Sequence, residues 1–205
     1  MVIISDYNAI RDAGRSLIKL IWENVSNDLP WRKNTGIDSD AQIVLSSPEA
    51  AGEQHKLSIY LYRIEEDAEL KNSCWQDEID KSRPAHIMRP SINLRLYYLI
   101  TPLAKDDEVN HIILGRILQI ANDHPVLRIP TLQGSLAGSE LKLILNPLSI
   151  DDMNKIWGII SKTKTCMTSL YYEISGLSID PSATTTLGRV SEIETKVVHR
   201  DEIEN

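Results

Sequence analysis

The segments LSIYLYRIEED, from Leu57 to Asp67, and RPSINLRLYYLITP, from Arg89 to Pro102, decide the fold of this chain. Both alternate as β-strands do, because successive side chains of a strand point to opposite faces of a sheet. The first segment has two faces, made of Leu57, Ile59 and Leu61 on one side and Tyr60, Tyr62 and Ile64 on the other. Since both faces are apolar, we expect a strand covered on two sides in a layered domain, or one that forms part of an assembly surface.

The rest of the chain predicts further elements around this pair. Apolar residues at helical spacing predict a helix over 6–26, a second that follows the acidic turn at Asp106 and ends at Pro125, and a third that starts at Ser149. Short strands are expected at 41–46, 140–147 and 167–180, and loops at 27–40 and 130–140. We therefore predict an α+β fold, with a mixed, mainly antiparallel β-sheet flanked by about three α-helices.

Two segments fall outside this core. Residues 65–90 have weak periodicity and two prolines, which predicts a long excursion from the sheet. Beyond Pro181 too few apolar residues remain to form a core, so we expect a flexible carboxy-terminal arm over 181–205. The predicted organisation is one domain over 1–180 followed by this arm, which suits a chain of 205 residues.

Composition excludes several classes of protein. A net charge of −7 disfavours binding to nucleic acid, which needs clustered Lys and Arg side chains. No apolar run approaches the roughly 20 residues that cross a bilayer, and the amino terminus lacks the features of a secretion signal. We therefore expect folding in the cytoplasm without a membrane partner. Cys74 and Cys166 lie far apart and outside any metal-ligand spacing, which favours reduced thiols.

The sequence contains no convincing catalytic motif. The loop from Gly134 to Gly138 only superficially resembles a nucleophile elbow or a phosphate-binding loop. The five histidines show no metal-binding spacing, and Asp151 and Asp152 are better explained as helix-start charges than as an acid/base pair. We expect no enzymatic activity, no metal and no cofactor.

The order of segments resembles a known family. LYRI in the first strand, YYLITP with Pro102, LGRIL followed by Pro125, and the PLS stretch that leads to Trp157 together resemble cap, or tail-terminator, proteins of extracellular contractile injection systems. These are phage-tail-like particles, and the resemblance is to the amino-terminal domain of their cap subunits. It covers roughly residues 5–180 and includes Asn72.

The resemblance implies a structural function. Such a cap is expected to form a ring, a hexamer that matches the sixfold tube, at the end distal to the baseplate, where it stops polymerisation of the inner tube and the sheath. Its implied partners are other copies of itself, the tube protein and the sheath protein. It would assemble in the cytoplasm as part of a particle that can then be released from the cell.

Two groups of residues are candidate interaction sites. Asn72 and Trp75 lie in the excursion and are expected to contact the tube or a neighbouring subunit. The arm alternates apolar and charged residues, and could dock on a partner as an added strand or a short helix through Val190, Ile193, Val197 and Val198.

Two alternative functions remain open at the level of sequence. One is another component of the same particle, such as a sheath adaptor or a baseplate subunit. The other is a small-ligand enzyme or binding domain with a pocket near the TLQGSLAGS loop, which runs from Thr131 to Ser139.

Overall fold

The computed structural model describes residues 6–67, 76–78, 86–88, 91–128, 130–132, 134–136, 138–161, 166–182 and 184–186. The chain divides into two compact units. The main unit comprises Met1–Ser73 and Ser91–Asp180, and the second comprises Cys74–Pro90 and Pro181–Asn205. Residues 74–90 of the expected excursion and the expected arm therefore belong to the same unit.

The main unit is built on a six-stranded sheet with the order β1-β2-β5-β8-β7-β6. Only β1 and β2 are parallel, and every other neighbouring pair is antiparallel. The strands are β1 (Ile43–Val44), β2 (Leu57–Glu66), β5 (Ile92–Pro102), β6 (Val126–Leu127), β7 (Leu141–Leu145) and β8 (Leu170–Ile179). This arrangement confirms the predicted mixed, mainly antiparallel sheet.

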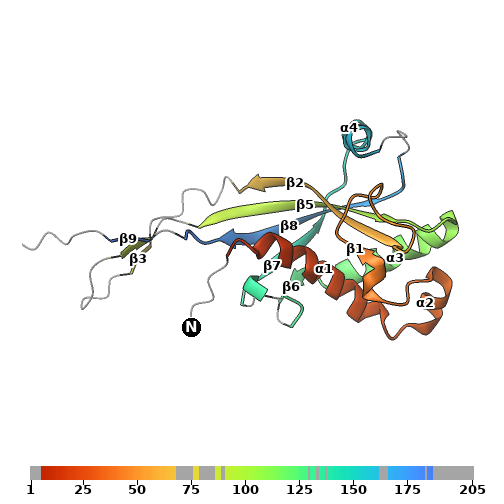
Figure 1. Cartoon of the computed structure of the whole chain (residues 1–205), viewed down its shortest axis with the longest axis horizontal. Coiled ribbons are helices and arrows are strands. Elements are labelled where there is room, and N and C mark those ends of the chain that lie inside the picture. Colours follow the sequence, from red (N-terminus) through yellow and green to blue (C-terminus); the bar gives the residue numbers. More distant parts are fainter. Residues whose placement is uncertain are drawn as a thin grey trace, which may run out of the picture. The chain divides into compact units, whose positions relative to one another are not determined.

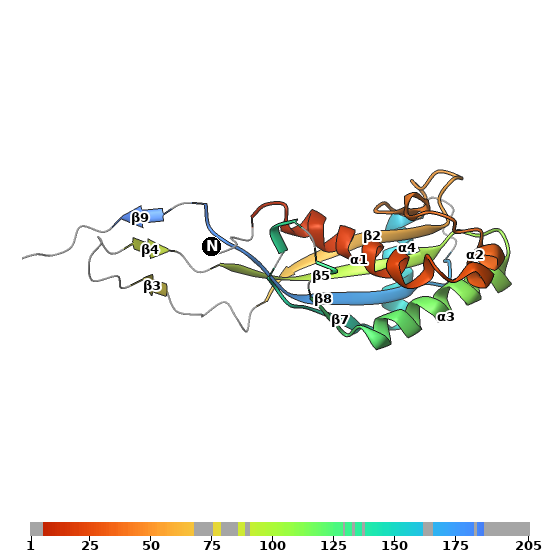
Figure 2. The same ribbon diagram turned by 90° about the horizontal axis from the view of Figure 1, so that it is seen from below.

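Helices cover the sheet unequally. Helices α1 (Ala9–Val25) and α3 (Asp107–Asp123) lie on one side of the sheet, which we call the helical face, and α4 (Ile150–Ile160) lies on the other (Figures 1 and 2). The helical face holds the main core, which includes Leu57, Leu96, Tyr98 and Ile174. The opposite face holds a smaller cluster of Leu99, Trp157 and Tyr171.

A further helix, α2 (Leu29–Thr35), lies in the segment that we expected to be a loop. Asp28 caps it by accepting a hydrogen bond from the Trp31 backbone N–H at 3.1 Å, and Pro30 occupies its first turn. Gly36 ends it in a left-handed conformation, with φ at 69°. These signals were present in the sequence, but a helix of seven residues is too short for an apolar period to reveal it.

A β-bulge changes the faces of β2. Leu61 pairs with Tyr98 and Arg63 with Tyr97, so Tyr62 is the extra residue. Beyond the bulge Ile64 pairs with Leu96, a residue of the main core, and directly paired residues share a face. The prediction that Ile64 shares a face with Tyr60 and Tyr62 is therefore wrong, because the inserted residue reverses the alternation.

Two short 3₁₀ turns complete the main unit, at Asp40–Gln42 and at Gly134–Leu136. The second unit contains an antiparallel sheet of three short strands in the order β3-β4-β9. These are β3 (Gln76–Glu78), β4 (His86–Met88) and β9 (Thr184–Thr186). The excursion supplies β3 and β4, and the first residues of the predicted arm supply β9, where Thr184 pairs with Met88.

Candidate assembly surfaces

The interaction residues expected from the sequence lie outside the described part of the chain. They are Asn72, Trp75, Val190, Ile193, Val197 and Val198. The structure does not test them, and they stay predictions. The surfaces that follow are built from described residues of the main unit.

The loop around Gly134 is fixed to α1 by a buried carboxylate. Asp12 is only 2% exposed, and its carboxylate accepts hydrogen bonds from the Ser135 backbone N–H at 3.0 Å and the Ser135 hydroxyl at 3.2 Å. Arg11 Nε donates to the same carboxylate at 2.8 Å. Gly134 has φ at 59°, and a Cβ atom there would lie 2.2 Å from Asp12 Oδ2. Ser135 is thus engaged in holding the loop, which argues against the nucleophile interpretation.

These contacts set the charge state of Asp12. Burial alone would raise the pKa of its carboxyl, but hydrogen bonds from the Ser135 backbone, Arg11 and the Ser135 hydroxyl together lower that pKa below its ordinary value. The carboxylate is therefore ionised in the folded protein at neutral pH. Sequence analysis missed this site, because Asp12 is an isolated acidic residue in an amphipathic helix.

The remaining titratable residues form no reactive constellation within the described ranges. No group of three or more His, Cys, Asp or Glu residues there could hold a metal ion. The pKa of Asp152 is lowered by hydrogen bonds from Ser149 and Lys155 at the start of α4, in keeping with its predicted role in starting a helix. No described helix is long and apolar enough to cross a membrane.

Tyrosines cover the side of the sheet under α4, which we call the aromatic face. Tyr62 lies 6.2 Å from Tyr97 and 6.3 Å from Tyr171, measured between ring centroids. Trp157 of α4 donates its indole N–H to the Tyr171 hydroxyl at 3.1 Å. Burial is the main cause that raises the pKa of both Tyr62 and Tyr97 to about 12, so these rings stay neutral at physiological pH.

Beyond α4 the same face carries charges that are paired within the chain. The Arg63 guanidinium lies over the Tyr97 ring at 5.3 Å and also contacts Glu65. Arg95 donates two hydrogen bonds to Asp67, at 3.0 and 3.1 Å. Because these charges neutralise each other, this region does not attract a strongly charged ligand.

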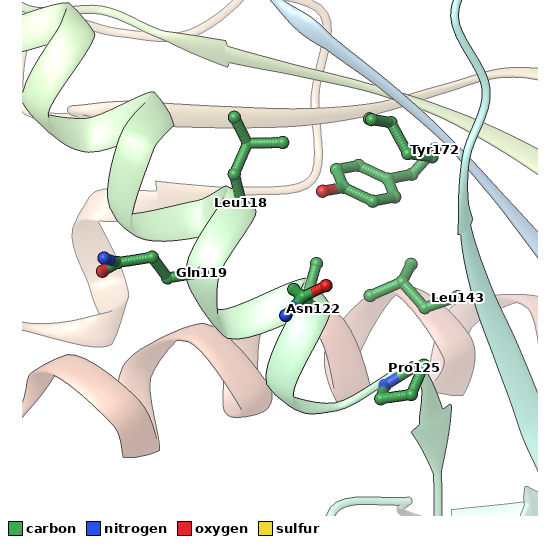
Figure 3. Close-up of a pocket in the computed structure, with 8 residues that line it drawn as sticks. Leu118, Gln119, Asn122, Pro125, Leu143 and Tyr172 are labelled. Atoms are coloured by element: carbon green, nitrogen blue, oxygen red, sulfur yellow. The ribbon is translucent and has the colours of Figure 1, made fainter.

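An open hollow of about 520 Å³ lies at the other edge of the sheet, between α3 and β7 (Figure 3). Leu118 of α3 and Leu145 of β7 line it and are 39% and 48% exposed. Tyr172 and Leu143 are buried at its base, and Gln119 and Asn122 add polar groups from α3. Its lining contains no carboxylate, histidine, cysteine, lysine or arginine, so it suits an apolar side chain better than a reaction. It does not include the TLQGSLAGS loop, where we expected any ligand pocket.

Helix α4 is apolar on both sides. Trp157 is its one fully buried residue, whereas Ile150 and Ile159 are 71% and 87% exposed. Met153, Ile156 and Ile160 of α4 are partly buried against the cluster of Trp157. Exposed apolar side chains on the outer side of such a helix are typical of a surface that another protein covers.

Comparisons with known proteins agree with a structural function. A family model described as the Pvc16 N-terminal domain matches residues 14–192. No curated protein matches the chain. Among solved structures, the sheath/tube terminator of the extracellular contractile injection system PVC, in its extended state, is similar with a TM-score of 0.62 at 15% identity. The match covers 93% of this chain and 63% of that terminator.

The tube-terminating cap of the anti-feeding prophage is also similar, with a TM-score of 0.49 and 16% identity over 68% of this chain and 48% of that one. At such identities the match to the PVC terminator shows the fold alone, and it confirms the predicted terminator-like α+β fold. The chain spans less than two thirds of the length of either protein.

Proposed function

Because this chain belongs to the Pvc16 N-terminal domain family, we propose that it is the cap, or terminator, of a contractile injection system. Membership of the family over residues 14–192 is the observation that carries this proposal. The fold, which it shares with a sheath/tube terminator, supports it further. The resemblance to cap proteins found in the sequence is confirmed by the same matches.

In this proposal the protein forms a ring, a hexamer, on the baseplate-distal end of the inner tube and the sheath, and stops their polymerisation. A closed ring of identical subunits needs two different complementary surfaces on each subunit, and a cap needs a further surface for the tube. The hollow at β7, the exposed isoleucines of α4 and the sheet edge at β2 supply apolar surfaces for such contacts. The protein acts by binding and catalyses no reaction.

Particle length tests the proposal. Deleting the gene should give tubes and sheaths of uneven length without caps, and adding the protein back should restore a uniform length in electron micrographs. A gold label on the protein should appear at the baseplate-distal end. A label at the baseplate would instead favour the alternative of a baseplate subunit, and unchanged lengths in the deletion would refute the terminator role.

We further propose that Asn72 and Trp75 of the excursion contact the tube or a neighbouring subunit. Long loops of compact domains often carry function, and tryptophan is among the residue types that contribute most to binding at interfaces. Trp75→Ala should reduce the amount of cap on purified particles, measured by quantitative blotting, while the melting temperature stays unchanged. Incorporation equal to that of the unaltered protein would remove Trp75 from the interface.

A further inference from the structure

Two strands of the main sheet have edges that are partly uncovered. One is β2, which carries the exposed Ile64, and the other is β7, which borders the hollow. On one side β1 pairs with β2 only at Leu57 and Ser58, so among the described residues no strand covers β2 from Ile59 to Glu65. On the other side β6 pairs with β7 at Leu141 and Lys142, and the Leu143 backbone N–H donates to the Pro125 carbonyl, so that within the described ranges no strand covers Ile144 and Leu145. Figure 2 shows β2 and β7 toward opposite edges of the sheet. Unpaired strand edges are templates for pairing with another chain.

We propose that β2 of one copy pairs with β7 of the next copy, and that Ile64 enters the hollow between α3 and β7. This inference deepens the proposed ring and rests on it. Ile64 is 48% exposed and stands on the helical face, because the bulge at Tyr62 moves it there. Leu145 lies on the same face, since it pairs with Tyr172 of the main core. The exposed Ile64 side chain at the β2 edge therefore lies on the same face as the hollow at the β7 edge.

The direction of the strands agrees with this contact. From β2 through β5 and β8 to β7 each pair is antiparallel, so β7 runs opposite to β2. A neighbouring copy that continues the sheet therefore presents its β2 antiparallel to β7. Such an interface is heterologous, because it joins two different edges, and a repeated heterologous contact gives a ring when the rotation between successive copies closes.

Charge complementarity favours a particular register. With Ile64 of one copy opposite Leu145 of the next, Glu65 stands opposite Ile144. Lys142 lies two residues before Ile144 and therefore on the same face, diagonally across from Glu65. Diagonal partners are about 7–8 Å apart, which is within the reach of a lysine side chain. Lys142 is exposed and has no ion-pair partner among the described residues. Glu65 already contacts Arg63 of its own chain, but its side chain is 36% exposed and can accept from a second cation.

Disulfide trapping tests the pairing. The test variant is the full chain with Ile64→Cys and Leu145→Cys, in which Cys74 and Cys166 are replaced by serine. Three strand spacings, about 14 Å in total, separate the two positions within one copy, so a bridge inside one chain is excluded. Oxidation of the assembled protein, at high concentration or on purified particles, should give a ladder of covalent dimers and higher oligomers. The matched control pairs Ile64→Cys with Ile159→Cys, which is exposed on α4 and should give no ladder.

A charge swap gives a second measurement on a folded protein. Lys142→Glu should weaken self-association by about threefold to fivefold in sedimentation equilibrium, the effect of one exposed ion pair. Adding Glu65→Lys should recover most of the loss. A ring or a multi-copy cap that forms without a ladder above the control overturns this interface and leaves the proposed function standing. A protein that stays monomeric and is absent from particles overturns both.

Discussion

Asp12 is the charged residue on which the described core most clearly depends. Its carboxylate is buried against the loop at Ser135 and is held there by three donors from two residues. Removing a partner from a buried, charge-assisted network leaves polar groups without hydrogen bonds, and the cost is larger than that of an exposed contact. We call this contact of Asp12 with the turn at Gly134–Leu136 the clamp, because it holds the loop on α1.

We predict that Asp12→Asn lowers the free energy of unfolding by about 2 kcal/mol. The pKa of Asp12 is lowered in the folded state, so its contribution is present above the unfolded value near 3.8 and is lost as pH falls through the folded value. The stability of the variant should consequently fall less steeply than that of the wild type below pH 4. Urea unfolding between pH 3 and pH 7 measures this, with the exposed Glu53→Gln as the control. The prediction would be contradicted if the free energy of unfolding fell equally steeply below pH 4 in Asp12→Asn and in the wild type.

Two glycines give a matched test of the same clamp. Gly134→Ala should destabilise the protein by about 1–3 kcal/mol, because the added Cβ meets Asp12 and the backbone has a positive φ. Gly115→Ala places its Cβ in open space on α3 and should stabilise the helix by up to about 1 kcal/mol. Thermal unfolding should shift in opposite directions for the two variants. A shift in the same direction would show that the clamp is not rigid.

At the element scale α4 differs from the other long helices. Helices α1 and α3 bury many residues in the main core, whereas α4 buries only Trp157. The Trp157 hydrogen bond to Tyr171 and its packing on Leu99 hold α4 on the aromatic face. An element with so few buried residues can open without unfolding the rest of the domain.

We predict that Trp157→Ala releases α4 selectively. Amide hydrogen exchange should become faster over 150–160 and stay unchanged over α1, because the main core lies on the other face of the sheet. Trp157→Phe keeps most of the packing but leaves the Tyr171 hydroxyl without its donor, and should cost about 1 kcal/mol. Equal acceleration in α1 and α4 would show that the two clusters unfold together.

At the scale of the whole molecule, the second unit combines segments that are far apart in sequence. β4 comes from the excursion and pairs with β9, which lies at the start of the arm. The first part of the arm therefore contains residues that belong to a sheet, whereas Ala183 and residues 187–205 lie outside the described chain. Its two parts can have different roles.

Two truncations separate these roles. Ending the chain after Thr186 keeps β9 and removes Val190, Ile193, Val197 and Val198, and we predict a folded protein that caps particles poorly. Ending it after Asp180 also removes β9, and we predict an additional loss of protection in β4 by hydrogen exchange. Circular dichroism should show that the main sheet persists in both. Normal capping by the chain that ends at Thr186 would exclude residues 187–205 from the interface.

The fold class and most elements of the main unit can be predicted from the sequence alone, whereas the two-residue strand β6 was not predicted. Alternation in β2 and β5 and helical spacing in α1 and α3 are local patterns, so they can be read without knowing which elements meet. The family resemblance, and with it the proposed function, also came from the order of these segments. The short helix α2 was not predicted, because its seven residues are fewer than two helical periods.

The residues that form each surface could be identified only from the packing of the folded chain. The bulge at Tyr62 depends on the pairing of β2 with β5, and it alone brings Ile64 to the helical face. The contact of Asp12 with Ser135 joins residues 123 positions apart, and the hollow at β7 forms where α3 passes Leu145. Such features arise from the packing of distant elements, because a local pattern specifies the faces of a strand but not which neighbour covers them.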